Sequence, residues 1–300
     1  MQKKLLITGI NGFTGKHLER HFQSQGYQVL GMVHRHTPDM PDTHYVCDFQ
    51  NSKQIRRLIQ SLQPQYVIHL VAISFVAHSP LQDFYQINAL GTQWLLEALS
   101  MLPTLPQKIL LASSATVYGN QPVSLLHEAL CPSPVNHYGV SKLAMEHIAH
   151  NQFSDLPIIL ARPFNYTGIG QPSHFLIPKI VQHYQQKQSS ITLGNLHVER
   201  EFNDIELILH AYQRLLESPH QQEVVNIASN RGIKLLEVIE MMNQIAGYTI
   251  QVKTDPQFIR PNEIPKLTGD PAKLHQLVGK ITQKPIHQTL TEMYQSIPIY

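Results

Sequence analysis

Short apolar runs alternate along the first half of the chain with segments of helical periodicity. The apolar runs occupy residues 4–9, 27–33, 44–48, 66–72, 108–114 and 157–163. Continuous runs of this kind predict strands that are buried on both faces. The intervening segments, with apolar residues three and four positions apart, are 13–26, 52–64, 88–102 and 138–152. Repeated strand–helix units predict an α/β fold, with a parallel sheet covered by helices on both faces.

The pattern changes near residue 164. From there prolines and glycines interrupt it, and helices mix with isolated short strands. We therefore expect a first domain over residues 1–163 and a smaller, mixed α/β C-terminal lobe over residues 164–300. Since no linker-like composition separates them, we expect the lobe to be partly interleaved with the first domain.

A glycine-rich turn joins the first predicted strand to the first predicted helix. It reads "TGINGFTG" and contains Gly9, Gly12 and Gly15. Glycines here let the backbone approach a pyrophosphate, and the helix N-terminus supplies free N–H groups. Because the turn lies inside a strand–helix–strand unit, it predicts a Rossmann-type, doubly wound dinucleotide-binding domain. A simple strand-to-helix turn is the alternative interpretation.

The end of the second predicted strand bears on the choice of dinucleotide. An acidic residue there would bind the ribose 2′-hydroxyl of NAD. Here Val33 is followed by "HRH", which contains Arg35, and arginine suits the 2′-phosphate of NADP. The sequence favours NADP(H), with NAD(H) as the other option and a surface arginine as the competing interpretation. Asp48, at the end of the third predicted strand, is a candidate contact to the adenine.

Tyr138 and Lys142 lie four residues apart in a predicted helix, so their side chains share one face. A nearby ammonium stabilises phenolate and is expected to lower the pKa of Tyr138, which could then exchange a proton with a sugar oxygen. Such a pair is common by chance. It gains weight from Ser114, because this hydroxyl ends a predicted buried strand and could bind the same substrate oxygen.

Composition and charge exclude several other classes. The chain has 300 residues, a formal net charge of +2 and scattered basic residues, which gives no indication of nucleic-acid or membrane binding. The two cysteines, Cys47 and Cys131, do not form a disulfide framework. The most apolar stretch, residues 67–77, is too short to span a membrane. The 18 histidines form no metal-binding motif, so we expect no metal site. We expect a cytoplasmic protein.

The motifs "TGINGFTG", "SSATVYG" and "YGVSK", in this order, resemble the extended short-chain dehydrogenase/reductase family of nucleotide-sugar epimerases, dehydratases and reductases. The resemblance continues through "RPFNYTGIGQ", "GNLHVEREFND" and "DPQFIRPNEIPKLTGD" and covers essentially the whole chain. It implies that Tyr138 is the acid/base and that Lys142 holds the nicotinamide ribose. It also implies that Ser114 orients the carbonyl.

The resemblance implies further contacts to cofactor and substrate. Those expected at the cofactor are Gly9, Asn11, Gly12, Phe13, Gly15, Arg35, Asp48, Phe49, Leu70, Ala72, Tyr138, Lys142 and Pro163. Those expected at the nucleotide-diphosphate sugar are Thr116, Asn165, Lys179, Arg200 and Arg260. A homodimer is also implied, packed through residues 81–101 and 137–152 of each subunit. For Arg200 or Arg260 taken alone, a structural arginine is the alternative.

The position two after Ser114 helps to choose between reactions within the family. The family resemblance implies a carboxylate at this position in the sugar 4,6-dehydratases, which remove the C5 proton and expel the C6 hydroxyl. This chain has Thr116 there, and its hydroxyl is too weak a base for that elimination. "SSATVYG" is similar to the UDP-hexose 4-epimerases. The C-terminal half is more similar to the GDP-4-keto-6-deoxy-D-mannose reductases, and the NADP preference agrees with an exchanging reductant. We therefore expect 4-keto reduction to a GDP-6-deoxyhexose of the GDP-D-rhamnose type, for polysaccharide assembly.

Two alternatives stay open beside the reductase. One is a UDP-hexose 4-epimerase and the other is an NADP-binding sensor without catalysis, which the presence of Ser114, Tyr138 and Lys142 disfavours. The chain also departs from the reductase pattern. Glu206 stands where a basic residue is usual, and the glutamate usual at Thr116 is absent. These departures bear on the identity of the sugar.

Overall fold

The computed structural model describes residues 2–74, 80–258 and 263–296. In these residues seven parallel strands form the main sheet, in the order β11-β6-β5-β4-β1-β2-β3. Their bounds are β1 Lys4–Thr8, β2 Gln28–Val33, β3 His44–Val46, β4 Tyr66–His69, β5 Lys108–Ala112, β6 Ile158–Pro163 and β11 Glu223–Ile227. The predicted Rossmann-type parallel sheet is confirmed. Strand order reverses between β1 and β4, which opens a crevice at the carboxyl ends of the strands.

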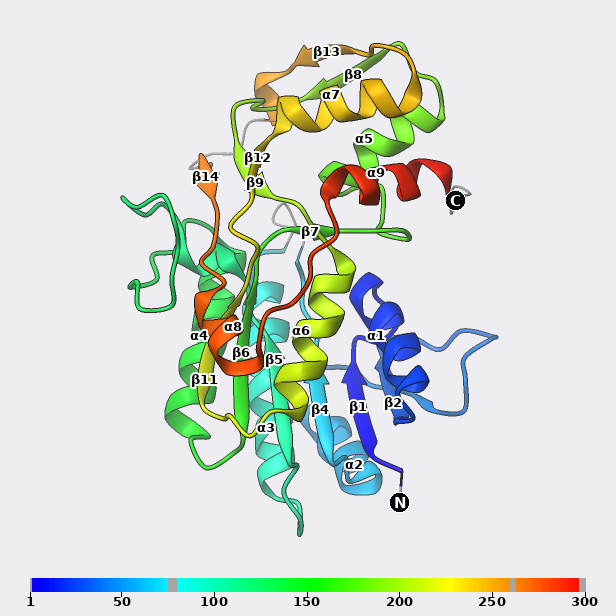
Figure 1. The fold of residues 1–300 in the computed structure, drawn as a ribbon. Helices are drawn as coiled ribbons and strands as arrows, with labels where there is room; N and C mark the ends of the chain where they lie inside the picture. Colours follow the sequence, from blue (N-terminus) through cyan, green and yellow to red (C-terminus); the bar gives the residue numbers. More distant parts are fainter. Residues whose placement is uncertain (1, 75–79, 259–262, 297–300) are drawn as a thin grey trace.

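Helices cover both faces of this sheet (Figure 1). One face packs on α1 (Phe13–Ser24), α6 (Ile205–Glu217) and α8 (Ala272–Val278). The other packs on α2 (Ser52–Leu62), α3 (Gly91–Ser100) and α4 (His137–Gln152). Each layer has its own buried apolar core, because strands of a parallel sheet present apolar side chains to both sides.

Two predicted elements differ from the observed ones by three residues at one end, and the others by no more than two. The fourth predicted strand ends at His69. Beyond it the Leu70 N–H is shared between the Thr8 carbonyl, at 3.2 Å, and the Thr8 hydroxyl, at 3.1 Å, and the Val71 N–H donates to that hydroxyl at 3.4 Å. The helix expected over 88–102 becomes α-helical only at Gly91, after the π-helical segment η1 (Phe84–Leu90). Both changes lie where the chain borders the crevice.

A second lobe lies beyond the carboxyl ends of the main strands (Figure 1). Its helices are α5 (Leu176–Gln185), α7 (Leu235–Ala246) and α9 (Ile286–Gln295). Its strands are β8 (Ser190–Leu193) paired with β13 (Gln251–Thr254), and β9 (Glu199–Glu201) paired with β12 (Gly232–Lys234) and β14 (Lys266–Leu267). These elements enclose a separate apolar core. Short 3-10 turns occur at η2 (Ala115–Tyr118) and η3 (Pro256–Phe258).

The chain passes between the two parts more than once. Where it first crosses, β7 (Tyr166–Thr167) pairs with β10 (Asn203–Asp204). It then returns through α6 and β11, and β11 completes the main sheet beside β6. The chain after β6 therefore contributes the strand β11 and the helices α6 and α8 to the lobe built on the main sheet.

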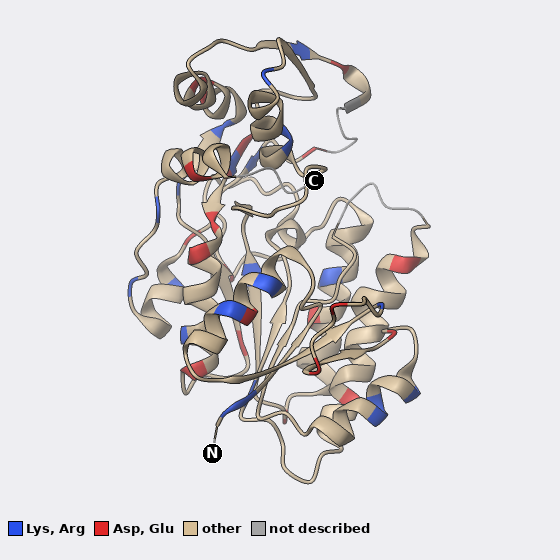
Figure 2. Cartoon of the chain, turned by 90° about the vertical axis from the view of Figure 1, so that its right-hand side faces the viewer, with Lys and Arg blue, Asp and Glu red and all other residues tan. Residues whose placement is uncertain are grey.

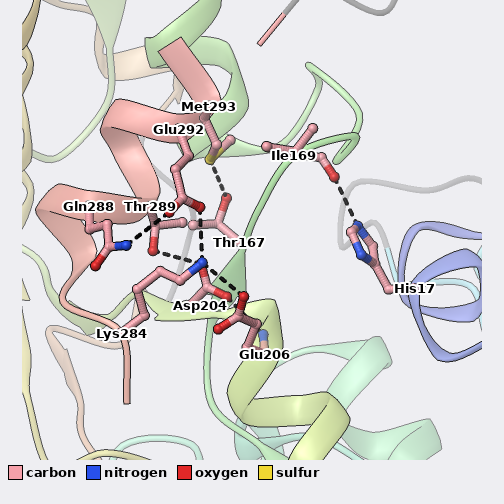
Figure 3. Close-up of polar contacts among 10 residues, drawn as sticks. All are labelled: His17, Thr167, Ile169, Asp204, Glu206, Lys284, Gln288, Thr289, Glu292 and Met293. Atoms are coloured by element: carbon pink, nitrogen blue, oxygen red, sulfur yellow. Dashed lines mark hydrogen bonds and ion pairs between the residues drawn. The ribbon is translucent and has the colours of Figure 1, made fainter. Parts of the chain in front are cut away.

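A polar cluster holds α9 against the start of α6 (Figure 3). Asp204, the N-cap of α6, accepts hydrogen bonds from the Glu206 backbone N–H at 2.8 Å and the Thr289 hydroxyl at 2.7 Å. The Lys284 ammonium pairs with Glu206 and Glu292, both at 2.9 Å. Because α6 packs on the main sheet and α9 on the second lobe, the cluster fixes one part against the other.

Residues of both charges are interspersed along both lobes of the chain (Figure 2). In the described part of the chain, no helix combines the length and the apolar character that a membrane crossing requires. Among the same residues, histidine, cysteine, aspartate and glutamate side chains do not gather in threes as metal ligands would.

Candidate active site

A cavity of about 760 Å³ lies between the main sheet and the second lobe. Most residues predicted to bind cofactor or substrate line it. They are Gly9, Asn11, Gly12, Phe13, Gly15, Asp48, Phe49, Leu70, Ala72, Ser114, Thr116, Tyr138, Lys142, Pro163, Asn165 and Arg200. The structure thus brings together residues from the ends of β1, β3, β4, β5 and β6 and from the lobe.

Three predicted contacts are not among the lining residues. Arg35 is exposed, next to His34, which does line the cavity. Lys179 lies on α5 and donates a hydrogen bond to the Thr192 carbonyl at 3.1 Å, inside the lobe. Its role as a substrate ligand stays a prediction. Arg260 lies outside the described residues.

The glycine-rich turn forms a cradle at the start of α1. A Cβ atom at Gly15 would lie 2.5 Å from the carbonyl oxygens of Gly9 and Ile10, so a side chain there would displace the backbone. Gly9 has a φ of +71°, which glycine adopts without strain. Gly12, the N-cap, has no side chain to occupy the free N–H groups of the first turn. The cradle suits the pyrophosphate of a dinucleotide.

Ser114 is held at the end of β5 by its neighbour two residues on. The Ser114 hydroxyl accepts hydrogen bonds from the Thr116 backbone N–H at 3.2 Å and from the Thr116 hydroxyl at 2.9 Å. A serine oxygen has two acceptor sites and one proton. Since both acceptor sites are in use, Ser114 can act only as a donor, and its side chain also hydrogen-bonds Tyr138.

Tyr138 is the second residue of α4, which the Asn136 side chain caps by accepting from the Gly139 N–H at 2.9 Å. Burial raises the pKa of Tyr138 to about 12, and the Ser114 side chain opposes that rise. The expectation of a lowered pKa is therefore wrong. Desolvation of the phenolate outweighs the favourable contacts, so this phenol is protonated at neutral pH and suited to donate a proton.

Lys142 is almost fully buried, with 2% of its surface exposed. Its ammonium donates to the Ala112 carbonyl at 2.7 Å, at the end of β5. Burial lowers the pKa of Lys142 to about 8, while Glu146, one turn further along α4, acts in the opposite direction. The ammonium of Lys142 is therefore engaged at the end of β5.

Glu146 joins the catalytic helix to the strands beneath it. Its carboxylate accepts two hydrogen bonds from the Arg162 guanidinium, at 2.9 and 2.6 Å, and one from the Ser113 hydroxyl. All three side chains are buried. Because Ser113 precedes Ser114 and Glu146 follows Lys142, this ion pair fixes the separation of the two candidate catalytic elements.

His69, at the end of β4, is buried and hydrogen-bonded through both ring nitrogens. The Thr92 hydroxyl donates to the Asn88 carbonyl at 2.8 Å and therefore accepts from His69 Nε2, also at 2.8 Å. His69 Nδ1 then accepts from the Thr8 hydroxyl at 2.7 Å. Burial lowers the pKa of His69 to about 3, so the ring is neutral.

Asn88 extends this network to the catalytic helix. Its amide accepts from the Ile73 N–H at 2.8 Å and donates to the Ser141 hydroxyl at 2.9 Å. Ser141 donates to the Tyr138 carbonyl at 2.8 Å. A network of five polar side chains thus connects the loop after β4, which lines the cavity, to the first turn of α4. Its members are Thr8, His69, Thr92, Asn88 and Ser141. No local pattern predicts this network, because its contacts join residues far apart in the chain.

The second lobe closes the other end of the cavity. The Arg200 guanidinium donates to the carbonyls of Glu199 at 2.9 Å and Pro265 at 3.2 Å and to that of Ile264, which holds it beside the cavity. Glu263 also lines the cavity, and its buried Oε2 atom has no hydrogen-bond partner among the residues that the structure describes. Glu263 lies in the quoted "RPNEIPKLTGD" stretch, yet sequence reasoning did not select it.

Comparison with known proteins gives matches along nearly the whole chain. A family model described as GDP-mannose 4,6 dehydratase matches residues 6–293. A GDP-6-deoxy-D-talose 4-dehydrogenase of Aggregatibacter actinomycetemcomitans is 32% identical over 295 residues, covering 98% of this chain and 97% of the relative. A GDP-6-deoxy-D-mannose reductase of Pseudomonas aeruginosa is 32% identical over 304 residues, covering 97% of this chain and 95% of the relative.

Solved structures agree with these matches. A presumed epimerase from Burkholderia cenocepacia J2315 superposes with a TM-score of 0.91 at 40% identity, covering 97% of both chains. The Pseudomonas aeruginosa protein RMD, solved with NADPH, superposes with a TM-score of 0.83 at 29% identity, covering 97% of this chain and 98% of that one.

Proposed function

The chain belongs to the GDP-mannose 4,6-dehydratase-like family of extended short-chain dehydrogenases/reductases, and on this premise we propose that it reduces the C4 keto group of GDP-4-keto-6-deoxy-D-mannose with NADPH. It is a nucleotide-sugar enzyme that uses a nicotinamide cofactor. The substrate, the direction and the choice of NADPH are the proposal. The observation that carries it is the meeting of Ser114, Tyr138 and Lys142 in one cavity with the glycine cradle.

The names of the two relatives support this substrate. 6-Deoxytalose and 6-deoxymannose differ only in configuration at C4, so oxidation at C4 converts both into the same 4-keto sugar. A reductase acting on that keto sugar gives one or the other epimer according to the face on which hydride arrives. The product is thus a GDP-6-deoxyhexose.

The residues of the cavity argue against 4,6-dehydration, although the matching family model carries that description. Dehydration needs a base that removes the C5 proton. Thr116 occupies the position expected for this base, and its hydroxyl is bonded to Ser114 at 2.9 Å. Among the described residues that line the cavity, carboxylates come from Asp48, after β3, and Glu263, in the lobe.

The reaction follows from the proposed roles of three side chains. The glycine cradle would hold the pyrophosphate of the dinucleotide, whose reduced nicotinamide would supply the hydride that C4 receives. Tyr138 donates its phenolic proton to the C4 oxygen, which becomes the hydroxyl. The Ser114 hydroxyl, which lies beside Tyr138, donates to the same oxygen and stabilises the negative charge that develops there. Lys142 holds the nicotinamide ribose and, once the proton has left, stabilises the phenolate of Tyr138.

The preference for NADPH rests on Arg35. No carboxylate follows β2 directly, and Arg35 lies at the exposed rim beside the lining residue His34. A guanidinium at this rim would pair with the 2′-phosphate of NADPH in a charge-assisted hydrogen bond. Parallel assays with NADPH and NADH test the preference, and Arg35→Ala should reduce the difference between them.

The test is the fall in NADPH absorbance when purified protein meets GDP-4-keto-6-deoxy-D-mannose. We expect one NADPH consumed per sugar, with NMR of the product giving the C4 epimer. Tyr138→Phe should lower turnover by a factor of roughly 10² to 10⁴, because the proton donor is lost, while NADPH binding is retained. Absence of reduction with both NADPH and NADH would overturn this proposal. Interconversion of UDP-hexoses without net cofactor consumption would instead establish an epimerase.

A further inference from the structure

The segment that crosses from β6 into the second lobe lies between α1 and α9 (Figure 3). Its strand β7 contains Tyr166 and Thr167, and successive side chains of a strand point to opposite sides. The Thr167 hydroxyl contacts Gln171 at 2.6 Å and the Met293 sulfur, on α9, at 3.6 Å. Tyr166 points the other way, to the first turn of α1.

Several contacts fix the position of the Tyr166 ring on α1. The ring stacks on Phe13, with centroids 6.2 Å apart and an interplanar angle of 20°. His17 packs edge-on against Phe13 and bonds through Nε2 to the Ile169 carbonyl at 2.9 Å (Figure 3). The Tyr166 hydroxyl lies 2.7 Å from the Thr14 hydroxyl. The crossing segment is therefore attached to the helix that follows the glycine cradle.

Thr14 is the second residue of α1 and lines the cavity, as Tyr166 does. A phenol is a stronger acid than an aliphatic alcohol, so the Tyr166 hydroxyl is the better donor to the Thr14 hydroxyl. Thr14 then keeps its own proton for another acceptor. In the first turn of a helix that follows a phosphate cradle, that acceptor is an anion.

We propose that Tyr166 is a positioning residue for the dinucleotide pyrophosphate, because its hydroxyl orients the Thr14 hydroxyl so that Thr14 donates to a phosphate oxygen. The inference rests on the proposed function only in requiring that a dinucleotide occupies the cradle. It assigns to the crossing segment an indirect part in cofactor binding, through Thr14. The neighbouring residue Asn165 lines the same cavity.

The test measures binding, not turnover. NADPH affinity is determined by fluorescence titration for wild type, Tyr166→Phe, Thr14→Val and the double variant. We expect Tyr166→Phe to weaken binding about 3- to 10-fold and Thr14→Val about 10-fold, the range of single hydrogen bonds to neutral and charged groups. The double variant should bind about as weakly as Thr14→Val alone, since the two hydroxyls act in series.

Two controls make the result specific. Adenosine 2′-phosphate lacks the pyrophosphate, so its affinity should be the same in wild type and Tyr166→Phe. Tyr248→Phe removes a hydroxyl that donates to the Gln188 carbonyl at 3.2 Å in the second lobe and should leave NADPH affinity unchanged.

Three results would overturn the inference. They are unchanged NADPH affinity in Tyr166→Phe, additive losses in the double variant, and an equal loss of affinity for adenosine 2′-phosphate. A wild-type protein that binds NADPH but leaves the keto sugar unreduced refutes the proposed reaction and leaves this inference standing. A wild-type protein that binds no dinucleotide overturns both.

Discussion

Lys142 lowers the stability of the folded protein, although the proposed reaction requires its charge. Its ammonium is removed from water and bonded to one carbonyl, that of Ala112. Burial lowers its pKa from 10.5 to about 8. The unfolded chain therefore binds this proton more tightly than the folded chain does, and below pH 8 the charged lysine opposes folding. Catalysis in the proposed reaction needs the same charge.

Replacement of Lys142 by methionine should therefore stabilise the protein while abolishing reduction. We expect the free energy of unfolding to rise by about 1–3 kcal/mol at pH 7, from the lowered pKa. The gain should shrink as pH rises toward 10, where the wild-type lysine becomes neutral in both states. Urea denaturation at both pH values measures it, with Lys53→Met, at an exposed position on α2, as control. A less stable variant at pH 7 would show that the bond to Ala112 outweighs the burial of charge.

At the scale of elements, the polar network of Thr8, His69, Thr92, Asn88 and Ser141 joins β1, β4, α3 and α4 beneath the cavity. His69 is the residue of this network that can titrate. Burial holds its pKa near 3, below the ordinary 6.5, so the folded protein resists its protonation. Stability from neutral His69 is complete above pH 6.5 and is lost as pH falls toward 3.

This pH dependence distinguishes His69 from a residue that only fills space. At pH 7, His69→Gln should be less stable than wild type, because a buried hydrogen-bonded ring is lost. Between pH 7 and pH 5 the difference should shrink by roughly 2 kcal/mol, since glutamine does not titrate. Urea denaturation at the two pH values tests this, beside His150→Gln at an exposed site on α4. A difference that is constant with pH would contradict the assignment of a neutral, protected ring.

At the scale of the whole molecule, the outer surface of α3 and α4 bears apolar side chains. Leu90, just before α3, and Val140, on α4, are each 38% exposed, and Met101, just after α3, is 54% exposed. Trp94 is half-buried on the same helix. Residues 90, 94 and 101 recur at helical spacing, so they follow one stripe. We propose that this stripe and α4 form the interface of a homodimer.

Light scattering during size-exclusion chromatography tests the dimer. Wild type should elute with twice the 34.2 kDa mass of the chain. Val140→Glu and Leu90→Glu should shift it to the monomer, because a charge would be buried without a partner. Leu236→Glu, at an exposed apolar position on α7, should not. A monomeric wild type, or dimers in all three variants, would refute this interface.

The sequence predicted the first part of the molecule well because its signals are local. Apolar runs gave the strands, and the glycine turn and the Tyr138–Lys142 spacing led to the residues that meet in the cavity. The return of β11 to the main sheet carries no such signal, since β11 is one short strand among others. The predicted lowering of the Tyr138 pKa was wrong for a similar reason. This pKa depends chiefly on desolvation, which only the assembled fold determines.

The position of β11 has a consequence for synthesis of the chain on the ribosome. When β6 has emerged, its outer edge still lacks a neighbour, and the partner strand follows only after β7 to β10, α5 and α6. Until then the growing sheet presents unpaired N–H and C=O groups, which can pair with other nascent chains. The main sheet therefore cannot be completed during translation before the chain has passed once through the second lobe. The protein matures as one cooperative unit, although it has two lobes.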